Sequence, residues 1–161
     1  MSNVNEYGCL MLRTFLPETI KNKLPEIDLD DVSDDGIEKQ HHITLLYGLH
    51  ESVSWKECKN KLENFDPISD VKLTNITFFD NDDADVLICE VESETLHKMN
   101  KKLKTLPHQE TFPEYKPHMT IAYLKKGCGE KYTREINISF KKLDTLIYSE
   151  VDGTKIYWFL K

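Results

Sequence analysis

Two short segments of the sequence place a histidine and a threonine two residues apart at the start of an apolar run. They are His42-Ile43-Thr44 and His118-Met119-Thr120. Alternate residues of a β-strand point to the same face, so each segment would present one imidazole and one hydroxyl together. Imidazole suits proton transfer near neutral pH, and a hydroxyl can donate a hydrogen bond to an oxygen on which charge develops. The pattern predicts a site where two histidines and two threonines converge.

A structural explanation of the same pattern is two edge histidines followed by threonines that favour strands. One His-x-Thr in a chain of this composition is expected by chance about half the time, so a single copy is weak evidence. Here both copies begin a strand-like run, and each lies in its own half of the chain. This context favours the functional interpretation.

Length and composition are those of one globular domain. The chain has 161 residues, 39% of them apolar and 30% charged, and no apolar run approaches the roughly 20 residues that span a bilayer. We therefore predict a single domain of two lobes over residues 1–161, with no membrane partner. The N-terminus lacks a basic, apolar leader, which predicts a cytoplasmic location. The net charge of -7 disfavours binding of long nucleic acid but is compatible with a small ligand that has few phosphates.

The sequence contains no recognisable cofactor or metal motif. The four cysteines, Cys9, Cys58, Cys89 and Cys128, lack metal-ligand spacing, and Cys9 and Cys89 lie in strand-like runs where we expect small core residues. No Walker loop, Gly-x-Gly-x-x-Gly, Gly-x-Ser-x-Gly or His-Glu-x-x-His is present. We predict a metal-independent site without a cofactor.

The acidic stretch 26–39 has some features of a calcium loop. Its closing position should be a bidentate glutamate but is His42, so the pattern fails. Runs of charge are usually solvated, and we expect an exposed acidic loop here.

Patterning predicts an α+β chain in which strands and helices mix. Within the second motif strand, simple alternation places Met119, Ile121 and Tyr123 on the core face, away from His118 and Thr120. Expected strands cover residues 8–15, 42–47, 71–79, 86–91, 115–124, 136–140 and 154–160, and expected helices cover residues 17–24, 54–64 and 93–105.

An α+β domain with two strand-borne His-x-Thr motifs resembles the 2H phosphoesterase superfamily. The resemblance extends from Leu16-Pro17 through both motifs to the terminal strands. It implies a bilobal, LigT-like fold in which two pseudosymmetric antiparallel sheets flank a central groove, with helices outside. It also implies that His42, Thr44, His118 and Thr120 line this groove.

Within the superfamily the chain is most similar to the phage anti-CBASS phosphodiesterases, which cleave the cyclic oligonucleotide signals of bacterial immunity. The similarity includes Tyr7 before the first strand, the Tyr-Gly-Leu at 47–49, and Asp152-Gly153 before a final strand that contains a tryptophan. It implies a phosphodiesterase that acts on cyclic di- or trinucleotides in immune evasion. RNA 2′,3′-cyclic phosphodiesterases and 2′,5′-oligoadenylate phosphodiesterases share the motifs and remain alternatives, as does a nucleotide-binding module without turnover.

The predicted chemistry is in-line attack of a ribose 2′-hydroxyl on its neighbouring phosphate. One histidine would deprotonate the 2′-hydroxyl and the other would protonate the leaving 5′-oxygen, while Thr44 and Thr120 donate hydrogen bonds to non-bridging oxygens. The sequence does not decide which histidine is the base.

Candidate substrate contacts are less strongly indicated than the two motifs. Aromatic rings stack on unpaired bases, which favours Tyr7 and Trp158 and, more weakly, Tyr47 and Tyr123. Glu150 is a candidate for a base edge or ribose. Packing explains each of these aromatic residues equally well. We expect His41 to be structural and His50, His97 and His108 to lie on the surface.

Overall fold

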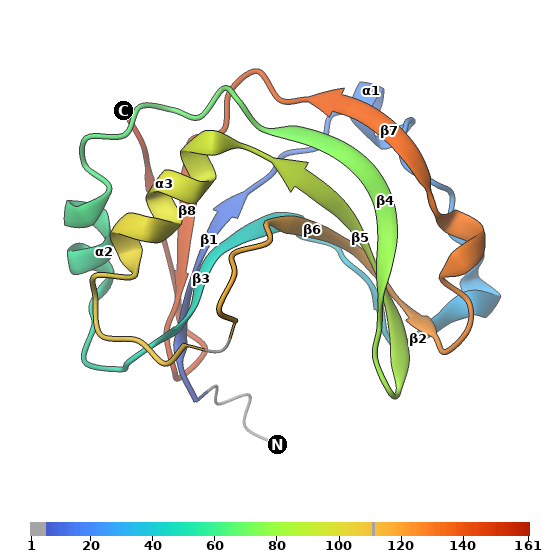
Figure 1. Ribbon diagram of the computed structural model, residues 1–161, viewed down its shortest axis with the longest axis horizontal. Helices are drawn as coiled ribbons and strands as arrows, with labels where there is room; N and C mark the ends of the chain where they lie inside the picture. The colour runs from blue at the N-terminus through green and yellow to red at the C-terminus, as the bar shows by residue number, and fades with distance from the viewer. Residues whose placement is uncertain (1–5, 111) are drawn as a thin grey trace.

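Antiparallel pairing joins nine strands into one strongly curved sheet in the computed structural model, which describes residues 6–110 and 112–161 (Figure 1). The strand order is β7-β4-β5-β6-β3-β1-β8-β9, and β2 pairs with β6 outside this path. The strands are β1 (Gly8–Arg13), β2 (Val32–Ile37), β3 (His42–Leu49), β4 (Lys72–Asp80), β5 (Ala84–Glu92), β6 (His118–Lys125), β7 (Arg134–Ser139), β8 (Thr145–Ser149) and β9 (Lys155–Phe159).

The sheet consists of two halves that meet at β3 and β6. One half is β9-β8-β1-β3 and the other is β6-β5-β4-β7, so each half has four strands on this path and contributes its motif strand to the junction. Within the described residues, the β3–β6 ladder that joins the halves consists of one residue pair, Ile43 with Met119. The predicted bilobal α+β fold is therefore confirmed, and its two sheets are continuous through this one pair.

Three α-helices, α1 (Glu18–Lys21), α2 (Trp55–Lys61) and α3 (Glu94–Leu103), accompany the sheet. The side chain of Ser93 accepts a hydrogen bond from the Leu96 N–H and so caps α3, as the sequence suggests. Helix α3 follows β5 but packs against β3 of the other half, where the Asn100 amide donates to the Leu45 carbonyl. Among the described residues no helix is long and apolar enough to cross a membrane.

The core occupies the face of the central strands opposite the two motifs. Ile43, Leu45, Met119 and Leu10 are fully buried there. Cys89 also belongs to this core, as predicted. Burial of these apolar side chains fixes which face of β3 and β6 is left for polar residues.

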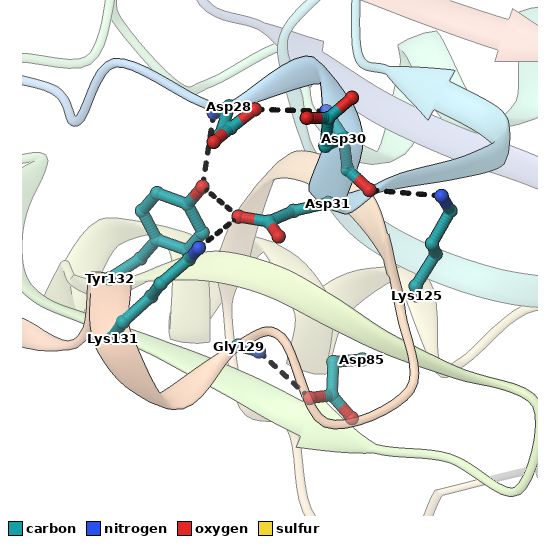
Figure 2. A network of polar contacts seen from close by, with 8 residues as sticks. All are labelled: Asp28, Asp30, Asp31, Asp85, Lys125, Gly129, Lys131 and Tyr132. Atoms are coloured by element: carbon teal, nitrogen blue, oxygen red, sulfur yellow. Dashed lines mark hydrogen bonds and ion pairs between the residues drawn. The ribbon is translucent and has the colours of Figure 1, made fainter.

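The acidic stretch is mostly exposed, as predicted, since Asp28, Asp30, Asp34 and Asp35 are solvent-exposed, but it is not a loop. It forms the 3₁₀ turn η1 (Leu29–Asp31) and then β2, which pairs with the outer part of β6. Asp31 is buried: it forms an ion pair with Lys131 and accepts a hydrogen bond from the Tyr132 hydroxyl at 2.5 Å (Figure 2). Backbone pairing and neutralisation of the buried carboxylate together make this acidic segment part of the fold.

A second buried carboxylate supports the turn that follows β6. Asp85, expected in the loop between residues 79 and 86, lies in β5 and accepts a hydrogen bond from the Gly127 N–H at 3.1 Å. It accepts a second one from the Gly129 N–H at 2.9 Å (Figure 2). The turn continues into the 3₁₀ helix η2 (Glu130–Tyr132), which carries Lys131 and Tyr132. We call the contacts of Asp31 with Lys131 and Tyr132 the η1–η2 clasp.

Candidate active site

The register of β3 against β6 brings the two motifs together. The antiparallel pair Ile43–Met119 has both side chains buried. Continued by one residue, this register sets His42 opposite Thr120 and Thr44 opposite His118, all four on the other face of the sheet. In a regular ladder the two histidines are then diagonal neighbours about 7–8 Å apart.

Both imidazoles are held in the same way by the backbone. His42 Nδ1 lies 2.9 Å from the Gln40 carbonyl, and His118 Nδ1 lies 2.9 Å from the Lys116 carbonyl. A carbonyl oxygen only accepts hydrogen bonds, so each Nδ1 must carry the proton. The neutral form of each ring therefore presents an unprotonated Nε2 that can take up a proton.

Neighbouring aromatic rings limit the positions of the motif residues. Phe79 contacts the His118 ring edge to face, with ring centroids 4.9 Å apart. The Tyr115 hydroxyl donates to the Thr44 carbonyl at 2.8 Å, and burial raises the pKa of Tyr115, so this hydroxyl remains a donor at neutral pH. These contacts come from the β4–β5 hairpin and from the segment before β6.

Cys9 is not the core residue expected from its strand. It lies half-buried next to Thr44, and burial raises the pKa of its thiol to about 11, although a hydrogen bond with Thr44 acts in the opposite direction. The thiol is therefore neutral at physiological pH and acts here as a small part of the wall.

A β-bulge in each motif strand reverses the alternation of side chains. In β6, Thr120 pairs with Ile88 but Ala122 pairs with Leu87, so one residue is inserted between them. In β3, Thr44 pairs with Met11 but Leu46 pairs with Leu10. The extra residue moves the following positions to the opposite face. The prediction that Tyr123 faces the core is therefore wrong.

The polar face of the junction opens into a cavity of about 810 Å³. Thr44, His118 and Thr120 line it, and His42 does not. The rest of its wall comes from both halves of the sheet and from the segment between α3 and β6, and includes Tyr47, Phe79, Lys104, His108, Tyr115 and Tyr123. The cavity lies within the size range typical of small-ligand sites.

The three predicted substrate contacts lie outside this cavity wall. Tyr7 packs edge to face against Tyr47, with ring centroids 6.0 Å apart. Glu150 lies in the β8–β9 turn, next to Ser149, which pairs with Cys9. Trp158 is only 6% exposed and packs against Trp55, so it is not available to stack on a base.

His50 and His97 are exposed, as predicted, whereas His108 and His41 are partly buried. His108 lines the cavity rather than the outer surface, and its Nδ1 lies 2.8 Å from the Leu106 carbonyl. The His97 ring packs edge to face with Tyr115. The backbone carbonyl of His41 accepts the Thr14 N–H, and burial lowers the pKa of its imidazole.

Sequence reasoning missed Asn100 and Tyr115, which both support β3 through its carbonyls. The Asn100 amide reaches the Leu45 carbonyl at 2.6 Å from a buried position in α3. The available signal was a polar residue on the apolar face defined by Leu96, Met99 and Leu103. Among the described residues no group of three or more His, Cys, Asp or Glu side chains is arranged to hold a metal ion.

Comparison with solved structures finds similar folds, among them three proteins whose chains are covered almost completely. E. coli LigT, solved in complex with 3′-AMP, has 16% identity and a TM-score of 0.53, with 97% of each chain covered. TT0787 of Thermus thermophilus has 17% identity and a TM-score of 0.50, with 95% of each chain covered. A protein described as a phosphoesterase has 12% identity and a TM-score of 0.50, with 97% of this chain and 96% of that chain covered. Comparison with curated proteins gave no match.

The chain thus has the fold of LigT and of the protein described as a phosphoesterase, with one His-x-Thr motif on each of the two strands that meet at its centre. The family model of the Anti-CBASS protein Acb1 matches residues 22–152, a segment that includes both motifs. The chain belongs to the Acb1 family.

Proposed function

We propose that this protein cleaves cyclic oligonucleotide immune signals, such as cyclic di- or trinucleotides, by attack of a ribose 2′-hydroxyl on the adjacent phosphate. The observation that carries the proposal is the pairing of Ile43 with Met119, which makes His42 and His118 diagonal neighbours with one threonine beside each. Membership of the Acb1 family supports a cyclic nucleotide as the substrate.

The reaction needs a base and an acid on opposite sides of phosphorus. The Nε2 of one histidine takes the proton of the 2′-hydroxyl, whose oxygen forms a bond to phosphorus. The P–O5′ bond breaks, and the protonated Nε2 of the other histidine gives its proton to the departing 5′-oxygen. The ring is thereby opened, and one end carries a 2′,3′-cyclic phosphate. Each histidine contributes roughly 10²–10⁴-fold to the rate.

Thr44 and Thr120 stabilise the charge that develops on the non-bridging phosphate oxygens. By the register continued from the Ile43–Met119 pair, each hydroxyl lies opposite the histidine of the other strand, on the same face of the sheet. Hydrogen bonds aimed at developing charge lower the barrier because they are already oriented before the reaction begins. The nucleophile belongs to the substrate itself, which favours the reaction through proximity.

Size and charge support a small substrate rather than a long nucleic acid. The cavity of about 810 Å³ can hold a few nucleotides. The chain carries a net charge of -7, and long nucleic acids are bound by proteins with extended basic surfaces. We also propose that Tyr7 and Glu150, at the outer end of β1 and β8, contact the part of the substrate that extends beyond the cavity.

A second candidate function is hydrolysis at the ends of linear RNA or of 2′,5′-oligoadenylate. The fold similarity to LigT, which was solved with 3′-AMP, favours this alternative. The two functions differ in substrate while sharing the same four motif residues.

Product analysis by mass spectrometry distinguishes these functions. The purified protein is incubated in EDTA with cyclic dinucleotides, cyclic trinucleotides, 2′,5′-oligoadenylate and RNA ending in a 2′,3′-cyclic phosphate. We expect ring opening of a cyclic substrate, unaffected by the chelator, and no cleavage of its 2′-deoxy analogue. Cleavage confined to the linear substrates would support the second candidate, and cleavage of the deoxy analogue would contradict 2′-hydroxyl attack.

A further inference from the structure

The two motif strands share a longer pattern than His-x-Thr. The first is His42-Ile-Thr-Leu-Leu-Tyr47 and the second is His118-Met-Thr-Ile-Ala-Tyr123, so a tyrosine follows each threonine at the same distance. Strict alternation would turn both tyrosines away from their histidines. A structural reason is therefore needed if they are to serve the same site.

The two β-bulges supply that reason. Each bulge falls between the threonine and the tyrosine, at Leu45 in β3 and at Ile121 in β6. One inserted residue brings Tyr47 to the face of His42 and Tyr123 to the face of His118. Both tyrosines line the cavity in the structure.

The cross-strand partners of the two tyrosines are also comparable. Tyr47 pairs across the sheet with Cys9 of β1, and Tyr123 pairs with Val86 of β5. Cys9 and Val86 both line the cavity, and neither is large enough to cover the ring opposite it. Each half of the sheet thus offers one tyrosine beside a small residue.

Antiparallel pairing places these two rings on opposite sides of the histidines. Tyr47 and Tyr123 each lie four positions beyond the central pair Ile43–Met119, in opposite directions. With one residue absorbed by each bulge, their backbones are about 20 Å apart along the ladder, at about 3.3 Å per residue. A substrate whose phosphate lies at the centre would extend one nucleotide toward each tyrosine.

We propose that Tyr47 and Tyr123 form two equivalent base-stacking subsites, one on each side of the phosphate that is cleaved. This inference rests on the proposed function and specifies its substrate: a cyclic oligonucleotide bound with its two flanking bases splayed apart. Tyrosine suits this task because every base has a π-face, so a base can stack on the tyrosine whatever its identity. Tyr7 packs edge to face against Tyr47 and so helps to hold the first of these rings in place.

The test compares leucine and phenylalanine at both positions. The variants are Tyr47→Leu, Tyr47→Phe, Tyr123→Leu and Tyr123→Phe, with Phe159→Leu as control, since Phe159 is 62% exposed on β9 and lies outside the cavity wall. Each leucine variant should raise the KM for a cyclic dinucleotide roughly 5- to 150-fold, the effect of losing one base stack. The phenylalanine and control variants should stay near wild type, and kcat should change little throughout.

A binding measurement separates stacking from other effects. The probe is the 2′-deoxy form of cyclic di-AMP with 2-aminopurine in place of one adenine, whose fluorescence is quenched when the base stacks. Wild type and the phenylalanine variants should quench it, and each leucine variant should quench it less. Unchanged KM and quenching in both leucine variants, with wild type still cleaving the ring, would overturn the inference but not the proposed function. Absence of any cyclic substrate cleavage by the wild type would overturn both.

Discussion

At the scale of single residues, the site depends on two imidazoles that are held alike. Each Nδ1 faces a backbone carbonyl two residues earlier, of Gln40 or of Lys116. We predict that both rings, when neutral, are protonated at Nδ1 only. Two-dimensional ¹H–¹⁵N NMR of the imidazole nitrogens in mildly alkaline buffer tests this prediction. An Nε2–H tautomer at either ring would contradict the geometry on which the proposed proton transfers depend.

The residue scale also shows where sequence reasoning succeeds and fails. Both His-x-Thr pairs could be recognised because alternation holds from His42 to Thr44 and from His118 to Thr120. It fails for Tyr123 and for Tyr47 because a bulge consists of one extra residue, which no local side-chain preference announces. The repeated tyrosine five positions after each histidine was the available signal. Trp158 was misjudged because its burial against Trp55 depends on a distant helix.

At the scale of elements, helix α3 supports the bulge of β3. The Asn100 amide donates to the Leu45 carbonyl, which lies at the inserted residue. Asn100→Ala leaves a buried carbonyl without this donor, so we expect the free energy of unfolding to fall by about 1–3 kcal/mol. We also expect a higher KM, because Tyr47 follows the bulge. Urea denaturation and steady-state kinetics measure the two effects.

The control for this change is Asn60→Ala, at an exposed position of α2. It should alter stability by no more than about 0.5 kcal/mol, as most surface substitutions do. Equal stability of the Asn100 and Asn60 variants would show that the hydrogen bond to Leu45 does not support β3.

The η1–η2 clasp should make stability depend on acidic pH. Lys131 and Tyr132 lower the pKa of Asp31, so the clasp stabilises the fold at pH values above the ordinary carboxyl pKa. This contribution is lost as the pH falls through the lowered pKa of folded Asp31. We expect Asp31→Asn to lower Tm by a few degrees at neutral pH, and the difference from wild type to shrink in strong acid.

Thermal denaturation over a pH series measures this difference, with Asp35→Asn as the control because Asp35 is an exposed carboxylate in β2, the strand that directly follows Asp31. A gap between wild type and Asp31→Asn that stays constant down to strong acid would contradict the assignment. The acidic composition of this segment predicted a solvated loop because charge patterning cannot reveal a partner about 100 positions away, such as Tyr132.

At the scale of the whole molecule, the two halves of the sheet are interdependent. The half β9-β8-β1-β3 is built from both ends of the chain, and β1 lies between β3 and β8. The α3 helix that follows β5 packs against β3. We propose that the chain is one domain and predict a single unfolding transition with equal calorimetric and van't Hoff enthalpies. Two separate transitions in differential scanning calorimetry would show that the halves fold independently.

The sequence allowed most strands of the fold to be predicted, but not the contacts where the two halves of the sheet meet. Hydrophobic alternation gave the strands of both halves except β8, and the paired motifs indicated that β3 and β6 lie at the centre. The single bridge Ile43–Met119, the addition of β2 to β6 and the packing of α3 on β3 depend on contacts between distant segments. Such contacts are set by tertiary packing, and local patterns do not report them.

The central claim is that His42 and His118 transfer protons on opposite sides of one phosphate. Its most direct test is kcat for a cyclic dinucleotide in His42→Ala, His118→Ala and the double variant, with circular dichroism to verify folding. We predict that each single variant loses roughly 10²–10⁴-fold in kcat, and that both retain the wild-type spectrum. Wild-type kcat in either folded single variant would contradict the claim.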